Sequence, residues 1–219
     1  MITTQTDYEK LFQLFAGKDE TRIYMNQPFK HNGKYYATDA YSLICMPAEK
    51  VELNFVEQDK PEVESVIPKE TNCNVEIKVA DIEKQLIPTM IDETIEEEIK
   101  NKCKECDGDG VVECDMEHEH ECPKCYGAGE IVTEIEKPTG KKILMGHKVF
   151  KMLEVGFQYT QLRRLIDACN MMGVETITKT FGTDKRGNLF TCGEVKILVM
   201  PAIISGDERE EFKPTEITV

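Results

Sequence analysis

A repeated cysteine motif constrains the fold of this 219-residue chain more than any other feature. The pattern CxxCxGxG occurs twice, as Cys103-Lys-Glu-Cys106-Asp-Gly108-Asp-Gly110 and as Cys122-Pro-Lys-Cys125-Tyr-Gly127-Ala-Gly129. Two residues between paired thiols let both sulfur atoms of a tight knuckle face one point, and the glycines allow positive φ angles that turn backbone N–H groups toward sulfur. Fifteen residues separate the two pairs, which is a spacing typical of a four-thiolate tetrahedral zinc site.

The motif predicts a structural Zn²⁺ ion held by Cys103, Cys106, Cys122 and Cys125. Such a closed site has no open position for water or substrate, and it commonly replaces a hydrophobic core in a segment too small to build one. The alternative is a redox pair or a set of disulfides. The chain begins Met-Ile-Thr-Thr-Gln-Thr-Asp, without a basic, apolar, cleavable leader, so we expect reduced thiols and a cytoplasmic location.

Other cysteine and histidine residues allow a second interpretation of the same region. Cys114, His118 and His120 lie between the knuckles and could form a second site or exchange with a ligand, although a polar hairpin tip is the simpler explanation. The remaining cysteines within apolar patterns are expected to be small buried hydrophobic residues: Cys45, Cys73, Cys169 and Cys192. The longest apolar run, 197–204, is too short to cross a bilayer, so we expect no membrane segment.

The charge is divided unevenly along the chain, whose formal net charge is −14. Residues 48–137 hold 26 acids and 10 bases, whereas residues 1–47 and 138–202 together hold 10 acids and 15 bases. A mildly basic body is therefore interrupted by an acidic insert that bears the knuckles. A zinc ribbon that grips nucleic acid usually carries Lys and Arg, so this insert should avoid phosphate backbones and is expected to be a solvated acidic face.

The first third of the chain is typical of one helix followed by short strands. Residues 7–17 carry apolar side chains at i, i+3, i+4 and i+7, and Gly17 ends the pattern. This periodicity predicts an amphipathic helix with a buried side formed by Tyr8, Leu11, Phe12 and Phe15. Alternating runs separated by turn residues such as Asn32-Gly33 predict antiparallel strands at 21–26, 27–30, 34–38 and 41–46.

The rest of the chain repeats this order after an irregular middle. We expect a strand at 74–79, a short helix at 80–86, an acidic bridge at 92–100, a strand at 131–136 and a turn at Pro138-Thr139-Gly140. The last third predicts a strand-like segment at 142–145, a helix at 159–172 that ends at Gly173, and strands at 174–180, 188–192 and 194–200. Each half thus presents one helix followed by three or more strands, which indicates a duplicated unit.

These patterns divide the chain into five segments. They are a first half of the body (1–47), an acidic connection with a strand and short helix (48–100), a zinc-finger insert (101–137), a second half of the body (138–202) and an acidic tail (203–219). The tip of the insert is the segment that depends on metal, whereas the body has its own apolar periodicity.

The segment from Asn32 to Leu43 resembles the signature of bacterial sliding clamps, in which a strand enters Ala-Thr-Asp-Gly-x-x-Leu, with Ala40 in place of the usual Gly. The helix at 157–173 and the run at 195–201, which ends Leu198-Val199-Met200-Pro201, are similar to the closing part of a clamp domain. The resemblance implies an α+β fold: a single DNA-clamp-like domain of two βαβββ halves with sheets outside and two helices facing DNA, here with an inserted zinc-ribbon subdomain. Since clamps close a ring from six such domains, a ring would require this chain to form a homo-oligomer.

Three cations are candidates for contact with double-stranded DNA under this resemblance. Lys10 and Arg164 lie opposite the apolar stripes of their predicted helices, and Arg163 is adjacent. Exposed Lys and Arg residues are also ordinary solubilising residues, so the helical wheel alone does not distinguish the two roles. Asp39 is expected to cap a turn, because no second carboxylate or His accompanies it at a catalytic spacing.

The knuckles resemble the cysteine-rich module of DnaJ-type chaperones, which also uses CxxCxGxG repeats. Only two of that module's four repeats occur here, and the chain lacks the His-Pro-Asp tripeptide of a J domain, so co-chaperone activity does not follow. We therefore expect a non-enzymatic clamp-like protein of DNA replication or repair whose finger binds a protein partner. The alternatives are a zinc-dependent protein-binding or chaperone-like module without DNA contact, and a metal-dependent enzyme, which would need an open coordination site.

Overall fold

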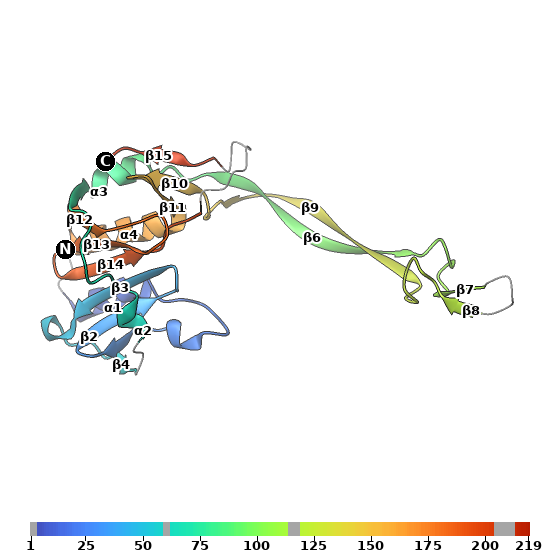
Figure 1. The fold of residues 1–219 in the computed structure, drawn as a ribbon, viewed down its shortest axis with the longest axis horizontal. Helices are drawn as coiled ribbons and strands as arrows, with labels where there is room; N and C mark the ends of the chain where they lie inside the picture. The colour runs from blue at the N-terminus through green and yellow to red at the C-terminus, as the bar shows by residue number, and fades with distance from the viewer. Residues whose placement is uncertain (1–3, 59–61, 114–118, 204–212) are drawn as a thin grey trace. The chain divides into compact units, whose positions relative to one another are not determined.

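The computed structural model describes residues 4–58, 62–113, 119–203 and 213–219 of a mixed α+β protein (Figure 1). The chain divides into two compact units. We call residues 1–89 and 145–219 the body, and residues 90–144 the knuckle unit. The knuckle unit is longer at both ends than the segment 101–137 that contains the cysteine motifs. None of the described helices is long and apolar enough to cross a bilayer.

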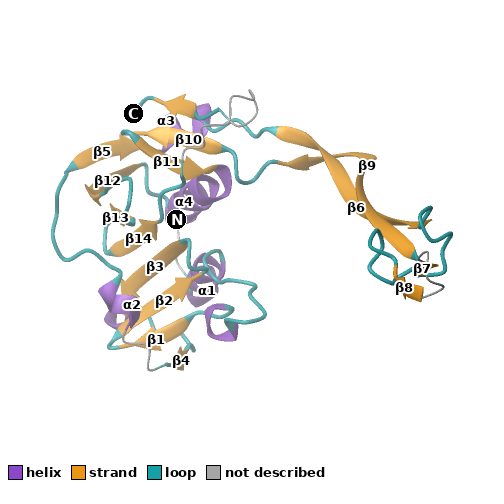
Figure 2. Ribbon diagram, turned by 45° about the vertical axis from the view of Figure 1, so that its right-hand side comes forward, coloured by secondary structure: helices purple, strands orange, loops and turns teal. Residues whose placement is uncertain are grey.

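An eight-stranded sheet organises the body, in the order β4-β1-β2-β3-β14-β13-β12-β5 (Figure 2). Its two halves join where β3 pairs antiparallel with β14. Residues that meet in this ladder include Leu43 with Leu198 and Ile44 with Ile197. The strands are β1 (Phe29–His31), β2 (Lys34–Thr38), β3 (Ser42–Pro47), β4 (Val56–Glu57), β5 (Val75–Lys78), β12 (Thr176–Phe181), β13 (Asn188–Cys192) and β14 (Val195–Val199).

A helix precedes each set of three antiparallel strands, which confirms the repeated order predicted from the sequence. Helix α1 (Gln5–Gln13) precedes β1 to β3, and α4 (Tyr159–Met172) precedes β12 to β14. Strands β10 (Val149–Met152) and β11 (Val155–Gln158) come before α4, but no strand precedes α1 within the described residues. Only the second half therefore has the expected βαβββ order.

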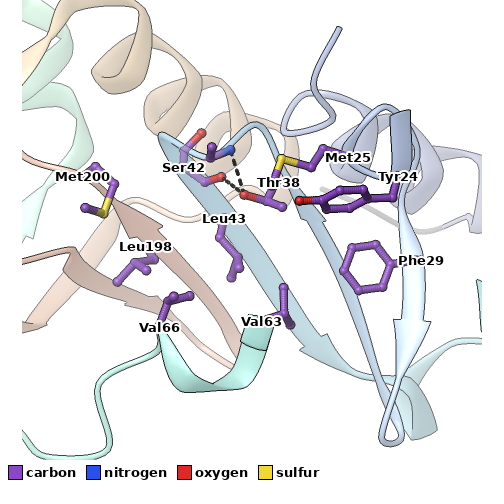
Figure 3. A pocket seen from close by; sticks show the side chains of 11 residues that line it. Tyr24, Met25, Phe29, Thr38, Ser42, Leu43, Val63, Val66, Leu198 and Met200 are labelled. Atoms are coloured by element: carbon purple, nitrogen blue, oxygen red, sulfur yellow. Dashed lines mark hydrogen bonds between the residues drawn. The ribbon is translucent and has the colours of Figure 1, made fainter. Parts of the chain in front are cut away.

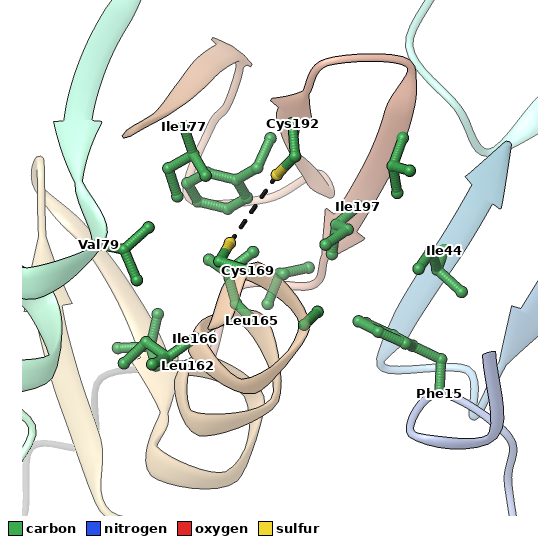
Figure 4. Close-up of a cluster of buried hydrophobic side chains, with 14 of the residues drawn as sticks. Phe15, Ile44, Val79, Leu162, Leu165, Ile166, Cys169, Ile177, Cys192 and Ile197 are labelled. Atoms are coloured by element: carbon green, nitrogen blue, oxygen red, sulfur yellow. Dashed lines mark hydrogen bonds between the residues drawn. The ribbon is translucent and has the colours of Figure 1, made fainter. Parts of the chain in front are cut away.

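The two long helices contact each other and cover one face of the sheet (Figure 4). Thr4 caps α1 by accepting a hydrogen bond from the backbone N–H of Asp7, and Gly173, at φ 68°, ends α4 in the left-handed conformation that glycine favours. Side chains from both helices and from β3, β13 and β14 form the main core, and those drawn in Figure 4 include Phe15, Ile44, Leu165, Ile166, Cys192 and Ile197. A small sheet, β11-β10-β15, and helix α3 (Val79–Gln85) add to this core, with β15 spanning Thr215–Ile217.

A smaller apolar cluster occupies the opposite face of the sheet. It contains Phe29, Tyr36, Leu43, Cys45, Phe181, Leu189 and Leu198. Val63 of the short helix α2 (Glu62–Ser65) packs against it, together with Ile67. Glu64 of α2 accepts hydrogen bonds from Lys34, Asn32 and Tyr36, and these partners lower the pKa of Glu64 to about 2. These hydrogen bonds connect helix α2 to strand β2 and to the turn that precedes β2.

The knuckle unit is built from two antiparallel ribbons. The long ribbon pairs β6 (Met90–Lys102) with β9 (Glu130–Leu144), and the short ribbon pairs β7 (Val111–Glu113) with β8 (Glu119–Glu121). Most of the long ribbon is exposed, and glutamates lie directly opposite each other where Glu96 meets Glu136 and Glu98 meets Glu134. Like charges at directly opposed positions destabilise a strand pair.

Two local predictions from the sequence are wrong. Residues 21–26 form no strand; they contain a 3-10 helix, Ile23–Met25, because Asp19 Oδ1 accepts hydrogen bonds from the backbone N–H groups of Thr21 and Arg22 and so fixes a bend. The acidic bridge at 92–100 leads to the knuckles as expected, and it forms part of β6. The turn at 138–140 is a bulge inside β9, where Thr139 Oγ1 donates a hydrogen bond to Glu93 Oε2 at 2.6 Å.

Candidate metal centre and apolar pocket

The structure brings the four motif cysteines of the knuckle unit together in one buried cluster. Their Sγ atoms all lie within 4.8 Å of one another. Cys103 Sγ is 3.8 Å from Cys122 Sγ, and Cys106 Sγ is 3.6 Å from Cys125 Sγ. In a regular tetrahedron with metal–sulfur bonds of about 2.3 Å, the sulfur atoms are about 3.8 Å apart. The cluster therefore has the dimensions of a four-thiolate metal site.

The same backbone hydrogen bonds hold the sulfur atoms in both motifs. The N–H of Gly110 donates to Cys106 Sγ, and the N–H of Gly129 donates to Cys125 Sγ, each at 3.3 Å. The knuckles also bond to each other, since Cys103 N–H donates to Gly129 O and Cys122 N–H donates to Gly110 O, each at 2.8 Å. The two knuckles therefore form a pseudo-twofold pair.

The last glycine of each motif is required because the opposite knuckle approaches it closely. Gly110 and Gly129 have φ angles of 78° and 73°. A Cβ atom on Gly110 would lie 2.4 Å from the carbonyl oxygen of Gly127, and one on Gly129 would lie 2.3 Å from that of Gly108. Both obstacles are backbone atoms of the other motif, so side chains are excluded from these two positions.

The electrostatics of the cluster favour a cation at its centre. Burial opposes ionisation of Cys106, but N–H groups of Gly110 and Gly108 and the neighbouring thiols lower the pKa of Cys106 to about 7. Burial and the neighbouring thiols raise the pKa of Cys125 to about 11, although the N–H of Gly129 acts in the opposite direction. One thiolate thus forms readily and suppresses ionisation of the next. A metal ion would neutralise the thiolates together, and a tetrahedral S₄ donor set suits zinc or iron.

The other candidate metal ligands do not join the described cluster. Cys114 and His118 lie outside the described residues. His120 is exposed in β8, where it pairs with Val112. Among the cysteines of the body, Cys45, Cys169 and Cys192 are buried, as predicted, and Cys73 is half-buried. Cys169 and Cys192 have their Sγ atoms 3.9 Å apart in the main core (Figure 4).

An apolar pocket of about 380 Å³ opens on the side of the sheet that carries α2 (Figure 3). Two segments far apart in the sequence meet there. Thr38 and Leu43 come from adjacent ends of β2 and β3, whereas Leu198 and Met200 come from β14 and the loop after it. Val63 and Val66 from α2 and the loop after it line another side. No pattern local to one segment could have predicted this pocket.

Asp39 organises the turn that borders the pocket, as the sequence predicted. Its Oδ1 atom accepts hydrogen bonds from the backbone N–H groups of Tyr41 and Ser42 and from Ser42 Oγ. Arg164 of α4 donates to Asp39 Oδ2 and to Ser42 Oγ, and its guanidinium lies 5.7 Å from the centre of the Phe15 ring. Asp39 is thus occupied by structural contacts.

The three cations predicted to face DNA lie in different environments. Arg164 is half-buried in the contacts just described, although its helical position predicted an outward side chain. Arg163 forms ion pairs with Asp167 and Glu83. Lys10 is exposed on α1 and makes no ion pair with a described residue. The helical pattern of the sequence could not reveal the contacts of Arg164, because Asp39 and Ser42 are more than a hundred residues away in sequence.

Ala40 adopts a conformation that glycine prefers, with a φ angle of 73°. A left-handed conformation costs an L-residue about 1 to 2 kcal/mol, and glycine avoids this strain but loses more chain entropy on folding. We expect Ala40→Gly to raise the free energy of unfolding by about 0.5 to 1 kcal/mol, measured by urea denaturation. The reverse change at Gly33, which has a φ angle of 71° and no atom within 4 Å of the position that a Cβ atom would occupy, should lower it by a similar amount. A loss of stability in Ala40→Gly would contradict the role of strain here.

No family model and no curated protein matches the chain. Solved structures similar to it include a DnaN sliding clamp from Bartonella birtlesii bound to griselimycin (13% identity, TM-score 0.48) and a DNA polymerase sliding clamp from Caulobacter crescentus (14%, 0.48). Both alignments cover 92% of this chain and 65% of the clamp chain. The DNA polymerase III beta subunit from Thermotoga maritima aligns with 93% of this chain, at 13% identity, 65% coverage of its own length and a TM-score of 0.47. The chain therefore spans less than two thirds of the length of these clamps.

Proposed function

We propose that this protein is a non-enzymatic, clamp-like protein of DNA replication or repair that docks segments of partner proteins in its apolar pocket. One observation carries the proposal: two of the segments that resemble sliding clamps, 32–43 and 195–201, contribute adjacent walls of the same pocket. A cavity of about 380 Å³ that is lined mainly by apolar side chains suits a few large apolar side chains of a linear peptide.

The knuckle unit supplies a structural zinc site and a second surface for protein partners. Zinc is the metal proposed because four thiolates in tetrahedral positions satisfy it completely and leave no coordination site open. The unit contains 16 acidic residues and 7 lysines, which disfavours contact with a phosphate backbone. Its partner is therefore a protein.

Of the three cations proposed to contact double-stranded DNA, Lys10 is the most available, because ion pairs already occupy Arg163 and Arg164. The same ion pairs favour the second candidate function, a zinc-dependent protein-binding module that does not touch DNA. Edge strands β4 and β5 have one unpaired side each in the described sheet, so self-association through them would provide the homo-oligomer that a ring requires. Retention on duplex DNA that weakens as salt increases distinguishes the clamp from the second candidate.

A charge at the edge of the pocket should weaken peptide docking. Val66 is 54% exposed and lines the pocket, so Val66→Glu places a carboxylate at its mouth without disturbing a buried contact. The probe is griselimycin, which is bound in one clamp structure, together with labelled peptides that contain paired Leu and Phe residues. We expect at least a tenfold loss of affinity by fluorescence anisotropy, which corresponds to about 1.4 kcal/mol.

The matched control for this experiment is Ile87→Glu. Ile87 is 70% exposed in the body and does not line the apolar pocket, so its replacement should leave peptide affinity unchanged. Equal weakening by both variants would show that added negative charge, rather than the pocket, determines binding. Absence of binding by every probe to the unmodified chain would refute the docking role.

A further inference from the structure

The two knuckles share one backbone but carry different surfaces. In the pseudo-twofold pair, Asp107 and Asp109 of the first motif correspond to Tyr126 and Ala128 of the second. We call the exposed residues Pro123, Tyr126 and Ala128 the second-knuckle surface. The first knuckle adopts the same backbone conformation with aspartates at these two positions. The fold of a knuckle therefore does not require an aromatic residue there.

Tyr126 has a backbone conformation that is unfavourable for an aromatic residue. Its φ angle is 51°, close to the 48° of Asp107, and its side chain is 85% exposed. Aspartate tolerates the left-handed region through local hydrogen bonds, whereas a bulky aromatic residue there is strained and uncommon. The exposed ring receives little packing within the knuckle unit to offset this strain. Strain of this kind is characteristic of positions that act in binding.

A glutamate side chain lies against the backbone that follows this aromatic residue. The Cγ and Cδ atoms of Glu121 are 3.5 and 3.6 Å from the point where a Cβ atom of Gly127, the neighbour of Tyr126, would lie. Glu121 is exposed in β8 and forms no ion pair with a described residue. The second knuckle thus combines a free aromatic face with an unpaired carboxylate on adjacent parts of the chain.

We propose that the second-knuckle surface binds an arginine side chain of a partner protein, with the guanidinium stacked on the Tyr126 ring and paired with the Glu121 carboxylate. Arginine matches both groups because its planar cation stacks on aromatic faces and donates hydrogen bonds in its plane, whereas lysine carries a compact point charge. The surrounding unit is strongly acidic, so a basic protein segment is attracted to it and nucleic acid is repelled. This inference rests on the proposed role of the knuckle unit as a protein-interaction module and names its binding residues.

The test uses the zinc-loaded full chain and labelled peptides of one sequence that carry arginine, lysine or neutral citrulline at the same three positions. Fluorescence anisotropy should show tightest binding of the arginine peptide. Tyr126→Gly should weaken that binding about three- to thirtyfold, whereas Tyr126→Phe should retain most of it because the ring remains. Glu121→Gln should weaken it at low salt and less at high salt.

The equivalent position in the first knuckle provides the control. Asp107→Gly makes the same backbone change in the first knuckle, so it should relieve any strain there without changing arginine binding by more than about twofold. Tyr126→Gly should also raise the thermal stability of the unit while it weakens arginine binding, whereas replacement of a purely structural tyrosine should lower the stability. Equal binding of the three peptides, or equal affinity of the Tyr126→Gly variant and the unmodified chain, would overturn the inference. Val66→Glu separates the two proposals, because loss of pocket docking should leave arginine binding intact.

Discussion

Removal of the metal should unfold the knuckle unit and leave the body folded. Apart from the four cysteines, the described part of this unit contains no fully buried apolar side chain, and only Val112 and Ile131 pack partly against the cluster. An isolated two-stranded ribbon is marginally stable in water, and opposed glutamates weaken this one further. Metal binding supplies about 10 to 16 kcal/mol in zinc-finger peptides, far more than such a ribbon can provide.

Limited proteolysis with and without a chelator measures this effect. We expect cleavage within residues 90–144 to accelerate by at least an order of magnitude after chelation, while fragments of the body persist because the described part of its core contains no cluster of metal ligands. Cys122→Ser should reproduce the chelated state, whereas Cys73→Ser, a change at a cysteine outside the cluster, should not. Equally rapid digestion of the body would show that the two units do not fold independently.

Gly129→Ala should be nearly as damaging as loss of a cysteine. The new Cβ atom would lie 2.3 Å from the carbonyl oxygen of Gly108, and a backbone atom cannot move without separating the knuckles. Together with the left-handed φ of 73°, this clash should lower the stability of the metal-bound unit by about 4 kcal/mol or more. Because folding and metal binding are coupled, metal affinity should fall about a thousandfold, measurable by competition with a chromophoric chelator.

Gly140→Ala is the matched control for that variant. Gly140 lies in β9 of the same unit with a φ angle of 78°, but no atom lies within 4 Å of its would-be Cβ. Replacement of Gly140 by alanine should lower the stability of the unit only by the conformational strain, about 1 kcal/mol. It should leave metal affinity nearly unchanged. Similar losses in both variants would mean that the φ angle alone, rather than the approach of the knuckles, makes Gly129 necessary.

Features that depend on local sequence could be predicted well. The four thiols, the glycine at the end of α4, and strands β2, β3, β13 and β14 follow from spacing, turn residues and alternation within a few residues. Of the long ribbon, residues 131–136 of β9 were predicted as a strand, but β6 could not be predicted in this way because both faces of the ribbon are largely exposed. Without a buried side, β6 has no alternation of apolar and polar residues to signal a strand, and its acidic composition resembles a loop.

Features that depend on residues distant in sequence could not be predicted from one chain. The apolar pocket requires β3 and β14 to be neighbours, and the half-buried position of Arg164 requires Asp39 and Ser42 to face α4. The bulge at residues 138–140 resembles a turn in the sequence because Pro-Thr-Gly is typical of turns, and only the pairing with β6 shows that the strand continues. The cysteine cluster that could hold a metal ion was predictable because its thiols belong to two local knuckles of known geometry.

The junction between β3 and β14 has a consequence for synthesis of the protein on the ribosome. Strand β3 emerges early, yet its partner in the centre of the sheet is translated about 150 residues later, so the ladder has high contact order. Until then, the backbone N–H and C=O groups along one edge of β3 have no strand partner. The strand, with the sequence Ser-Leu-Ile-Cys-Met-Pro, is also largely apolar. The nascent chain is therefore most vulnerable to aggregation before its last strands leave the exit tunnel, whereas the knuckles, whose contacts are local, can close around an ion while translation continues.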